Sequence, residues 1–256
     1  MFYNNINPVL VSIGSIEVRY YGLMYVLGAI IFYFMIYSLS KYTKRPLTKD
    51  ETAELIIYML VPAIICARIF YVVVYNFAYY LSNPAEIVML WKGGLSFHGG
   101  FIGAIIGGYF FCRKKKIRFY QLADIAVIPL SLALFFGRIG NFLNQELYGR
   151  VTSVPWAVKF RNAEGFRHPS QLYEAIKNII IFFVLLSLYL KKKLKEGAVF
   201  WLFVTSYSFL RFFIEFFREP DPQLGYILLG LTMGQVICII MFIVGAIFLV
   251  NIYKRK

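Results

Sequence analysis

The sequence predicts an all-α polytopic membrane protein with seven transmembrane helices. Apolar residues make up 60% of its 256 residues and charged residues only 16%, against about 45–50% and 25% in typical soluble proteins. The apolar residues gather in seven long stretches, most of them close to the length of about 20 residues that a helix needs to cross a bilayer. Aromatic residues reach 19%, which suits several water–lipid interfaces. These observations exclude an ordinary soluble domain.

The seven predicted spans alternate with basic segments. In chain order they are 20–40, 53–75, 93–112, 119–137, 173–190, 198–217 and 227–253. Basic clusters follow the first, third, fifth and seventh spans: Lys41, Lys44, Arg45 and Lys49; Arg113, Lys114, Lys115, Lys116 and Arg118; Lys191, Lys192, Lys193 and Lys195; and Lys254, Arg255 and Lys256. Short loops rich in Lys and Arg stay in the cytoplasm. We therefore expect the N-terminus outside and the C-terminus in the cytoplasm. The net charge of +14 then reflects topology and anionic-lipid contacts rather than nucleic-acid binding.

A polar and basic segment at about 138–172 separates the fourth and fifth spans. We expect it to form a small external head on one integral membrane domain that covers residues 1–256. Its basic excess is unusual for an external loop, and an anionic headgroup or an anionic partner would explain it. The first apolar stretch lacks the features of a cleavable signal peptide. Cys66, Cys112 and Cys238 lie far apart in apolar stretches, and they predict core residues rather than a disulfide or a zinc site.

Arginines occur where the membrane makes charge costly. Arg68 and Arg211 lie within predicted spans, and Arg138 lies at the outer end of one. Such groups usually pair or face a cavity, and arginine offers planar bidentate donors to a phosphate. For Arg68, a phosphate site and internal pairing or snorkelling are equally supported. Lys177 lies near a helix end, where snorkelling toward water is favoured.

The sixth span carries one polar stripe. Tyr207, Arg211, Glu215 and Arg218 are spaced by four, four and three residues among Phe, Leu and Ile, so they share a helix face. That face is expected to point into the bundle or a wet cavity, because contact with lipid would be unfavourable. Two interpretations stay open: an ion-pair ladder between Arg211 and Glu215, or a Tyr and an Arg oriented toward a substrate.

The third span begins with a glycine-rich segment. Gly103, Gly107 and Gly108 predict close helix packing. His98 lies between two glycine pairs near the expected outer interface. It is either a satisfied structural residue or a general base, since imidazole is close to neutral at physiological pH. No second set of ligands accompanies it, and we expect no metal site.

Five motifs follow one another along the chain. They are YYGLMY at Tyr20–Tyr25, GGLSFHGG at Gly93–Gly100, GRIGNFLNQELYGR at Gly137–Arg150, HPSQLYE at His168–Glu174 and RFFIEFFREPD at Arg211–Asp221. Together they resemble the signature segments of the prolipoprotein diacylglyceryl transferases of bacterial membranes. The resemblance runs from about Pro8 to about Leu231, nearly the whole chain.

This resemblance implies a reaction and a set of partners. The diacylglyceryl group of phosphatidylglycerol would pass to the lipobox cysteine thiol of a preprolipoprotein. The products would be a thioether and glycerol phosphate, in the first step of lipoprotein maturation. The enzyme would be a multi-pass protein of the bacterial inner (cytoplasmic) membrane with its active face outside. It would contact phosphatidylglycerol, preprolipoproteins and the bilayer, but no nucleic acid, and it would need no metal or other cofactor.

The resemblance also assigns residues. Arg138 occupies the position of the arginine that binds phospholipid, and His98, Tyr207 and Arg211 occupy catalytic positions. The other substrate-binding positions are Tyr21, Asn141, Glu146 and Gly149, and Glu215 and Arg218 are expected to support the site.

The chemistry sets what these residues must do. The leaving phosphate must be neutralised, which suits Arg138 and Arg211, and the attacking thiol must be ionised. His98 is the best candidate base, with Glu146 and Glu215 as alternatives. The main rival is a multi-span transporter with an arginine-lined anion pathway, which the gathering of polar residues toward one face disfavours. A serine hydrolase is disfavoured because no nucleophile elbow is present.

Overall fold

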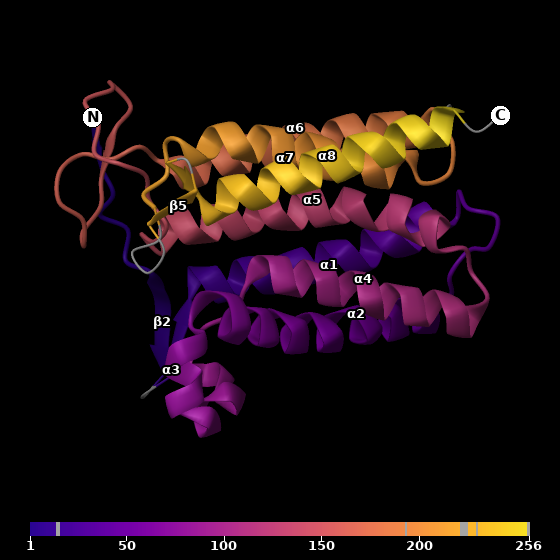
Figure 1. The fold of residues 1–256 in the computed structure, drawn as a ribbon, viewed down its shortest axis with the longest axis horizontal. Helices are drawn as coiled ribbons and strands as arrows, with labels where there is room; N and C mark the ends of the chain where they lie inside the picture. The colour runs from indigo at the N-terminus through magenta and orange to yellow at the C-terminus, as the bar shows by residue number, and fades with distance from the viewer. Residues whose placement is uncertain (14–15, 193, 221–224, 229, 255–256) are drawn as a thin grey trace. The chain divides into compact units, whose positions relative to one another are not determined.

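The structure, a computed structural model, is predominantly helical (Figure 1). It describes residues 1–13, 16–192, 194–220, 225–228 and 230–254. Lys193, Arg255 and Lys256 of the basic clusters and Asp221 of the fifth motif lie outside the described residues. The chain divides into two compact units: unit 1 is Met1–Met35 with Asp124–Lys256, and unit 2 is Ile36–Ala123.

Six helices in the described part of the chain are long and apolar enough to cross a membrane. They are α1 (Tyr20–Ser40), α2 (Lys49–Phe70, continued by the π-helical turn Tyr71–Tyr75), α5 (Phe119–Leu143), α6 (Ser170–Leu190), α7 (Ala198–Glu215) and α8 (Met233–Lys254). The chain is therefore an all-α, multi-pass membrane protein. The predicted third span is also a helix, α4 (Phe97–Lys115). It is not one of these six, because its glycines and its basic last turn lower its hydropathy.

In unit 2, α4 packs against α2 through glycines. At Gly99, Gly103 and Gly107, an added Cβ atom would collide with a backbone carbonyl oxygen of α2. Residues four apart share one helix face, so the three glycines form a continuous contact. The packing prediction is confirmed for Gly103 and Gly107. It is wrong for Gly108, where an added Cβ would meet nothing within 4 Å, because this residue lies off the i, i+4 face.

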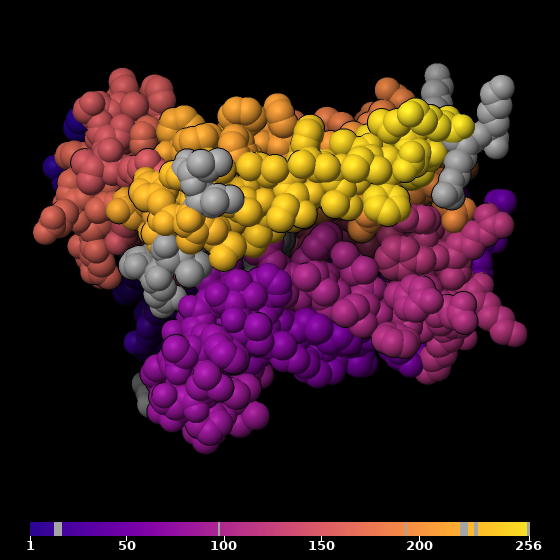
Figure 2. Space-filling model, viewed as in Figure 1, coloured from indigo at the N-terminus to yellow at the C-terminus, as the bar shows by residue number. Residues whose placement is uncertain are grey.

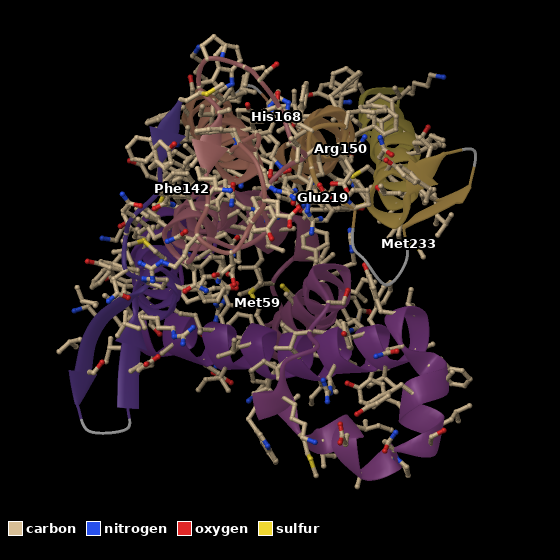
Figure 3. All side chains as sticks on the ribbon, turned by 90° about the vertical axis from the view of Figure 1, so that its left-hand side faces the viewer. Met59, Phe142, Arg150, His168, Glu219 and Met233 are labelled. Atoms are coloured by element: carbon tan, nitrogen blue, oxygen red, sulfur yellow. The ribbon has the colours of Figure 1, made fainter. Side chains whose placement is uncertain are left out.

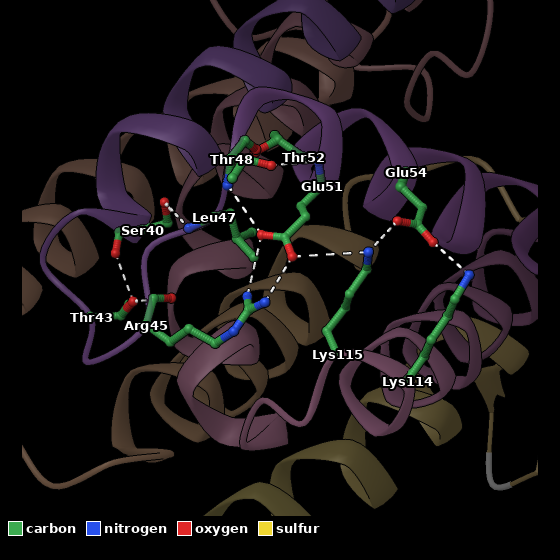
Figure 4. Close-up of polar contacts among 10 residues, drawn as sticks. All are labelled: Ser40, Thr43, Arg45, Leu47, Thr48, Glu51, Thr52, Glu54, Lys114 and Lys115. Carbon is green, nitrogen blue, oxygen red and sulfur yellow. Dashed lines mark hydrogen bonds and ion pairs between the residues drawn. The ribbon is translucent and has the colours of Figure 1, made fainter.

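The N-terminal end of α2 begins with a capping box. The Thr48 hydroxyl accepts from the Glu51 backbone N–H, and the Glu51 carboxylate accepts from the Thr48 N–H, which satisfies two donors of the first turn. Glu51 also pairs with Arg45 at 2.7 Å, and Glu54 pairs with Lys115 of α4 at 2.6 Å (Figure 4). Glu51 thereby holds the loop before α2 against α2, and Glu54 holds the basic end of α4 against the same helix.

Arg68 fixes the segment between α2 and α4. This segment contains α3 (Phe77–Ser82) and two 3₁₀ turns (Pro84–Val88 and Leu90–Lys92). Buried Arg68 donates to the carbonyl oxygens of Glu86 at 2.6 Å, Ile87 at 2.8 Å and Gly94 at 3.0 Å. Of the two interpretations of Arg68, a structural role is therefore favoured over a phosphate site, although its partners are backbone carbonyls rather than a carboxylate.

In unit 1, helices α6, α7 and α8 lie side by side (Figure 1). Helix α8 forms a broad strip of the surface in Figure 2, and several of its large apolar residues are exposed, as suits a lipid-facing helix. Asp124 of α5 accepts from the N–H groups of Gly197 at 2.6 Å and Phe200 at 2.8 Å. It thereby caps the start of α7, whose first N–H groups have no partner within the helix.

Short strands complete unit 1. They form a hairpin of β2 (Val9–Ile13) and β3 (Ile16–Arg19), a parallel pair of β1 (Phe2–Tyr3) and β4 (Val158–Lys159), and an antiparallel pair of β5 (Tyr226–Leu228) and β6 (Leu231–Thr232). The β1–β4 pair joins the N-terminal segment to the head. The Asn4 side chain also connects the N-terminal segment to the end of α5, by donating to the Phe142 carbonyl at 3.0 Å.

The non-helical head is shorter than the predicted segment. Helix α5 continues to Leu143, and α6 begins at Ser170, so the head proper spans 144–169. The glycines of the third motif do not interrupt α5. At Gly140, an added Cβ would lie 3.3 Å from Tyr21 of α1, so this glycine allows the two helices to approach closely.

Candidate functional site

The site begins at the last turn of α5, where Arg138 and Asn141 lie one turn apart. The Asn141 amide donates to the Glu146 carboxylate at 2.7 Å, and the Asn144 amide donates to its other oxygen at 2.9 Å. Arg138 is held only loosely, since its nearest polar partners among the described residues are Asn141 Oδ1 at 3.5 Å and the Glu174 carboxylate at 3.9 Å. Its side chain is 19% exposed. A guanidinium with such long contacts can reorient toward an anion.

Helix α6 supplies a buried carboxylate, Glu174, at the centre of the cluster. It lies 2.6 Å from Lys177 Nζ and 2.9 Å from Arg211 Nη1, in addition to its longer contact with Arg138. The Glu174 side chain is only 3% exposed. A buried carboxylate needs such partners, because its desolvation is costly.

The polar stripe of α7 faces inward, as predicted. Tyr207, Arg211 and Glu215 are all buried. The Arg211 guanidinium pairs with the Glu215 carboxylate, so the ion-pair ladder is present. Glu215 also accepts from Thr232 Oγ1 at 3.0 Å. Helix α7 ends at Glu215, so Arg218 continues the stripe from the following turn rather than from the helix, 3.8 Å from Glu215.

Tyr207 and Lys177 are in contact across α6 and α7. The ammonium group of Lys177 lies 3.7 Å from the centre of the Tyr207 ring, in cation–π geometry. Lys177 is 2% exposed in its side chain. The snorkelling prediction for Lys177 is therefore wrong: the i, i+3 partner Glu174 holds it inside the unit, and this attraction replaces contact with water.

Tyr21 of α1 faces the same region of unit 1. Its hydroxyl lies 2.8 Å from the Tyr25 hydroxyl, and it also interacts with the side chains of Asn141 and Glu146. It thus adds a neutral donor beside the signature residues of α5 and the head.

In the head, Arg150 and His168 lie near Glu219 (Figure 3). The Arg150 backbone N–H donates to the Phe217 carbonyl at 2.9 Å, just after the end of α7. The Gly149 N–H donates to the His168 carbonyl at 2.8 Å, and the His168 N–H donates to the Arg150 carbonyl at 3.0 Å. Arg167 pairs with Glu219 at 3.0 Å. An added Cβ at Gly149 would lie 2.7 Å from the Cβ of His168, so only glycine fits this crossing. Burial lowers the pKa of His168, which favours its neutral form.

His98 belongs to unit 2, whereas the arginine cluster belongs to unit 1. It lies in the first turn of α4, just after the N-cap residue Ser96, which accepts from the Gly99 N–H. Its ring centre is 6.4 Å from that of Phe70. The base role of His98 stays a prediction.

The cluster in unit 1 carries more positive than negative charge. Its cations are Arg138, Lys177, Arg211 and Arg218, and its carboxylates are Glu146, Glu174 and Glu215. At formal charges one positive charge is left over among these described residues. In a low-dielectric setting such an excess attracts an anion. The described residues include no group of three or more His, Cys, Asp or Glu side chains placed to hold a metal ion.

Comparison with known proteins identifies the family. The family model described as prolipoprotein diacylglyceryl transferase matches residues 8–251. The chain belongs to the prolipoprotein diacylglyceryl transferase family. It is 42% identical to the phosphatidylglycerol–prolipoprotein diacylglyceryl transferase of Geobacter sulfurreducens, over 100% of this chain and 99% of that protein. It is also 42% identical to the enzyme so named from Rickettsia canadensis, over 96% of both chains, and 41% identical to that of Vibrio campbellii, over 98% of this chain and 92% of that protein.

Within this transferase, most of the predicted site residues share unit 1. Tyr21, Arg138, Asn141, Glu146, Tyr207, Arg211 and Glu215 lie in one connected network or beside it. Their individual roles stay predictions. Glu174 and Lys177 form a buried pair that was not predicted from the sequence. The available signal was their i, i+3 spacing in an apolar helix that begins inside the fourth motif.

Proposed function

We propose that this chain transfers the diacylglyceryl group of phosphatidylglycerol to the lipobox cysteine thiol of a preprolipoprotein. The thiol sulfur forms a thioether with the glycerol carbon, the carbon–oxygen bond to phosphate breaks, and glycerol phosphate leaves with the electron pair. The observation that carries the proposal is the buried cluster with an unbalanced positive charge, built from residues of the family motifs. Such a cluster suits the charge that grows on the leaving phosphate.

Arg138 and Arg211 bind and neutralise that phosphate. Arg138 is the more adjustable of the two, because its contacts are long, whereas Arg211 is fixed between Glu174 and Glu215. Tyr21, Asn141 and Tyr207 donate to headgroup oxygens without adding buried charge. Glu146 and Glu215 hold their neighbours in place, and Gly149 and Arg218 support this arrangement. His98 accepts the thiol proton.

The proposed topology has α4 as a seventh span. With the basic loops in the cytoplasm, the N-terminus and the head lie outside, and the C-terminus lies in the cytoplasm. The arginine cluster is close to the head end of α5, α6 and α7, so the active face points away from the cytoplasm. We place this single membrane domain in the bacterial cell membrane, where phosphatidylglycerol and a translocating preprolipoprotein meet.

A mass assay tests the function directly. The purified chain is mixed with phosphatidylglycerol and a lipobox peptide, and we expect the peptide to gain a diacylglyceryl mass. A matched peptide with serine in place of the cysteine should gain none, because a hydroxyl is far less ionised than a thiol. An unmodified cysteine peptide would overturn the proposal. Uptake of a labelled anion by proteoliposomes without any transfer would support the transporter instead.

A further inference from the structure

Lys177 has a position that the transfer reaction does not by itself explain. It is a lysine in the second turn of α6 with a side chain only 2% exposed. Its ammonium touches two groups of the site, the Glu174 carboxylate at 2.6 Å and the Tyr207 ring at 3.7 Å. Burying a cationic side chain inside a membrane protein is costly, because the charge loses its contact with water and needs a partner within the protein.

The effect of the positive charge of Lys177 follows from the other partners of the Glu174 carboxylate. Its carboxylate also lies 2.9 Å from Arg211 Nη1 and 3.9 Å from Arg138 Nε. Arg211 is already paired with Glu174, so without Lys177 the carboxylate would draw its further compensation from Arg138. The Arg138 guanidinium would then turn from the ligand toward the carboxylate.

We propose that Lys177 is a positioning residue that neutralises Glu174, so that the loosely held Arg138 stays available to an anionic lipid phosphate. This inference rests on the proposed function. It makes the excess charge of the cluster depend on one residue: with Lys177 the cluster carries four cations against three carboxylates, and without it the formal charges cancel. The cation–π contact gives Lys177 a second role, because it also fixes the ring of Tyr207.

The proposal predicts an asymmetry between a single and a double substitution. Lys177→Met removes the excess positive charge of the cluster. Glu174→Gln/Lys177→Met removes one charge of each sign, so that the excess of one positive charge is present again. The Michaelis constant for phosphatidylglycerol in mixed micelles is therefore expected to rise about tenfold or more in Lys177→Met. In the double variant it should return to within about threefold of the parent value.

Thermal unfolding in detergent accompanies these assays. If Lys177 were only structural, Lys177→Met would lower stability and kcat, and KM would not recover in the double variant. That result would overturn the inference. An unchanged KM in Lys177→Met would overturn it as well. If Lys177→Met does not fold, Lys177→Gln is used with the same criteria, since its amide can still bond to Glu174. Failure of the parent chain to transfer lipid would instead contradict the proposed function.

Discussion

At Arg138, the contacts to Asn141 and Glu174 are long, and this is why we propose that it binds a ligand rather than holding the protein together. Arg68 is the contrast within the same chain, because its guanidinium is saturated by backbone carbonyls at normal hydrogen-bond distances. Both arginines lie in or next to predicted spans, and residue type alone did not separate them. The difference lies in what surrounds each guanidinium.

We expect Arg138→Lys to lose most of its transfer activity while the protein stays folded. A single ammonium cannot reproduce the two parallel donors that a guanidinium offers to a phosphate. Initial rates with phosphatidylglycerol and a lipobox peptide measure the effect, with the melting temperature as the control. Full activity in this variant would reduce Arg138 to a general electrostatic attraction.

His98→Gln tests the proposed base. Turnover should fall by about 10²- to 10⁴-fold, the usual cost of losing a general base, while phosphatidylglycerol binding survives. Raising the pH should partly restore the rate, because more of the peptide becomes thiolate as the pH approaches the ordinary thiol pKa of about 8.5. A pH–rate profile and a lipid-binding assay check both statements. Loss of lipid binding together with thermal stability would assign His98 a structural role.

At the scale of elements, the contact between α2 and α4 gives a matched pair of substitutions. Gly107→Ala places a methyl group against the Tyr58 carbonyl of α2, whereas Gly108→Ala places it in open space. We expect the first to lower stability by about 1–3 kcal/mol, the cost of overpacking. The second should be neutral or slightly stabilising, because alanine is the better helix former. Thermal unfolding in one detergent compares them, and equal melting temperatures would contradict the contact.

The helices could be predicted from the sequence because a bilayer imposes both length and composition on them. Their ends were harder to place. Helix α5 passes through Gly137 and Gly140 to Leu143, and of these two glycines only Gly140 lies close to α1. The i, i+3 spacing of Glu174 and Lys177 is visible in the sequence, but the burial of the pair is not, because it depends on α7 packing against α6.

At the scale of the whole molecule, the proposed topology can be tested with two single cysteines. Ser153→Cys lies at an exposed position of the head, and Lys44→Cys lies at an exposed position of the first basic loop. A membrane-impermeant maleimide should label the first in intact spheroplasts and the second only after the membrane is opened. The parent chain, whose own three cysteines lie in helices, provides the background. The reverse labelling pattern would show that the protein has the opposite orientation in the membrane.

The pairing of β1 with β4 has a consequence for the order in which the molecule is completed. Phe2 pairs with Val158, so the β-sheet partner of Phe2 is synthesised 156 positions after it. At about 5–20 residues per second, the N-terminal strand waits about 8–30 s for that partner. During this time the segment has no β-sheet neighbour, and it is exposed to proteases and to pairing with other chains. The head therefore closes late in biogenesis, after several helices have entered the membrane.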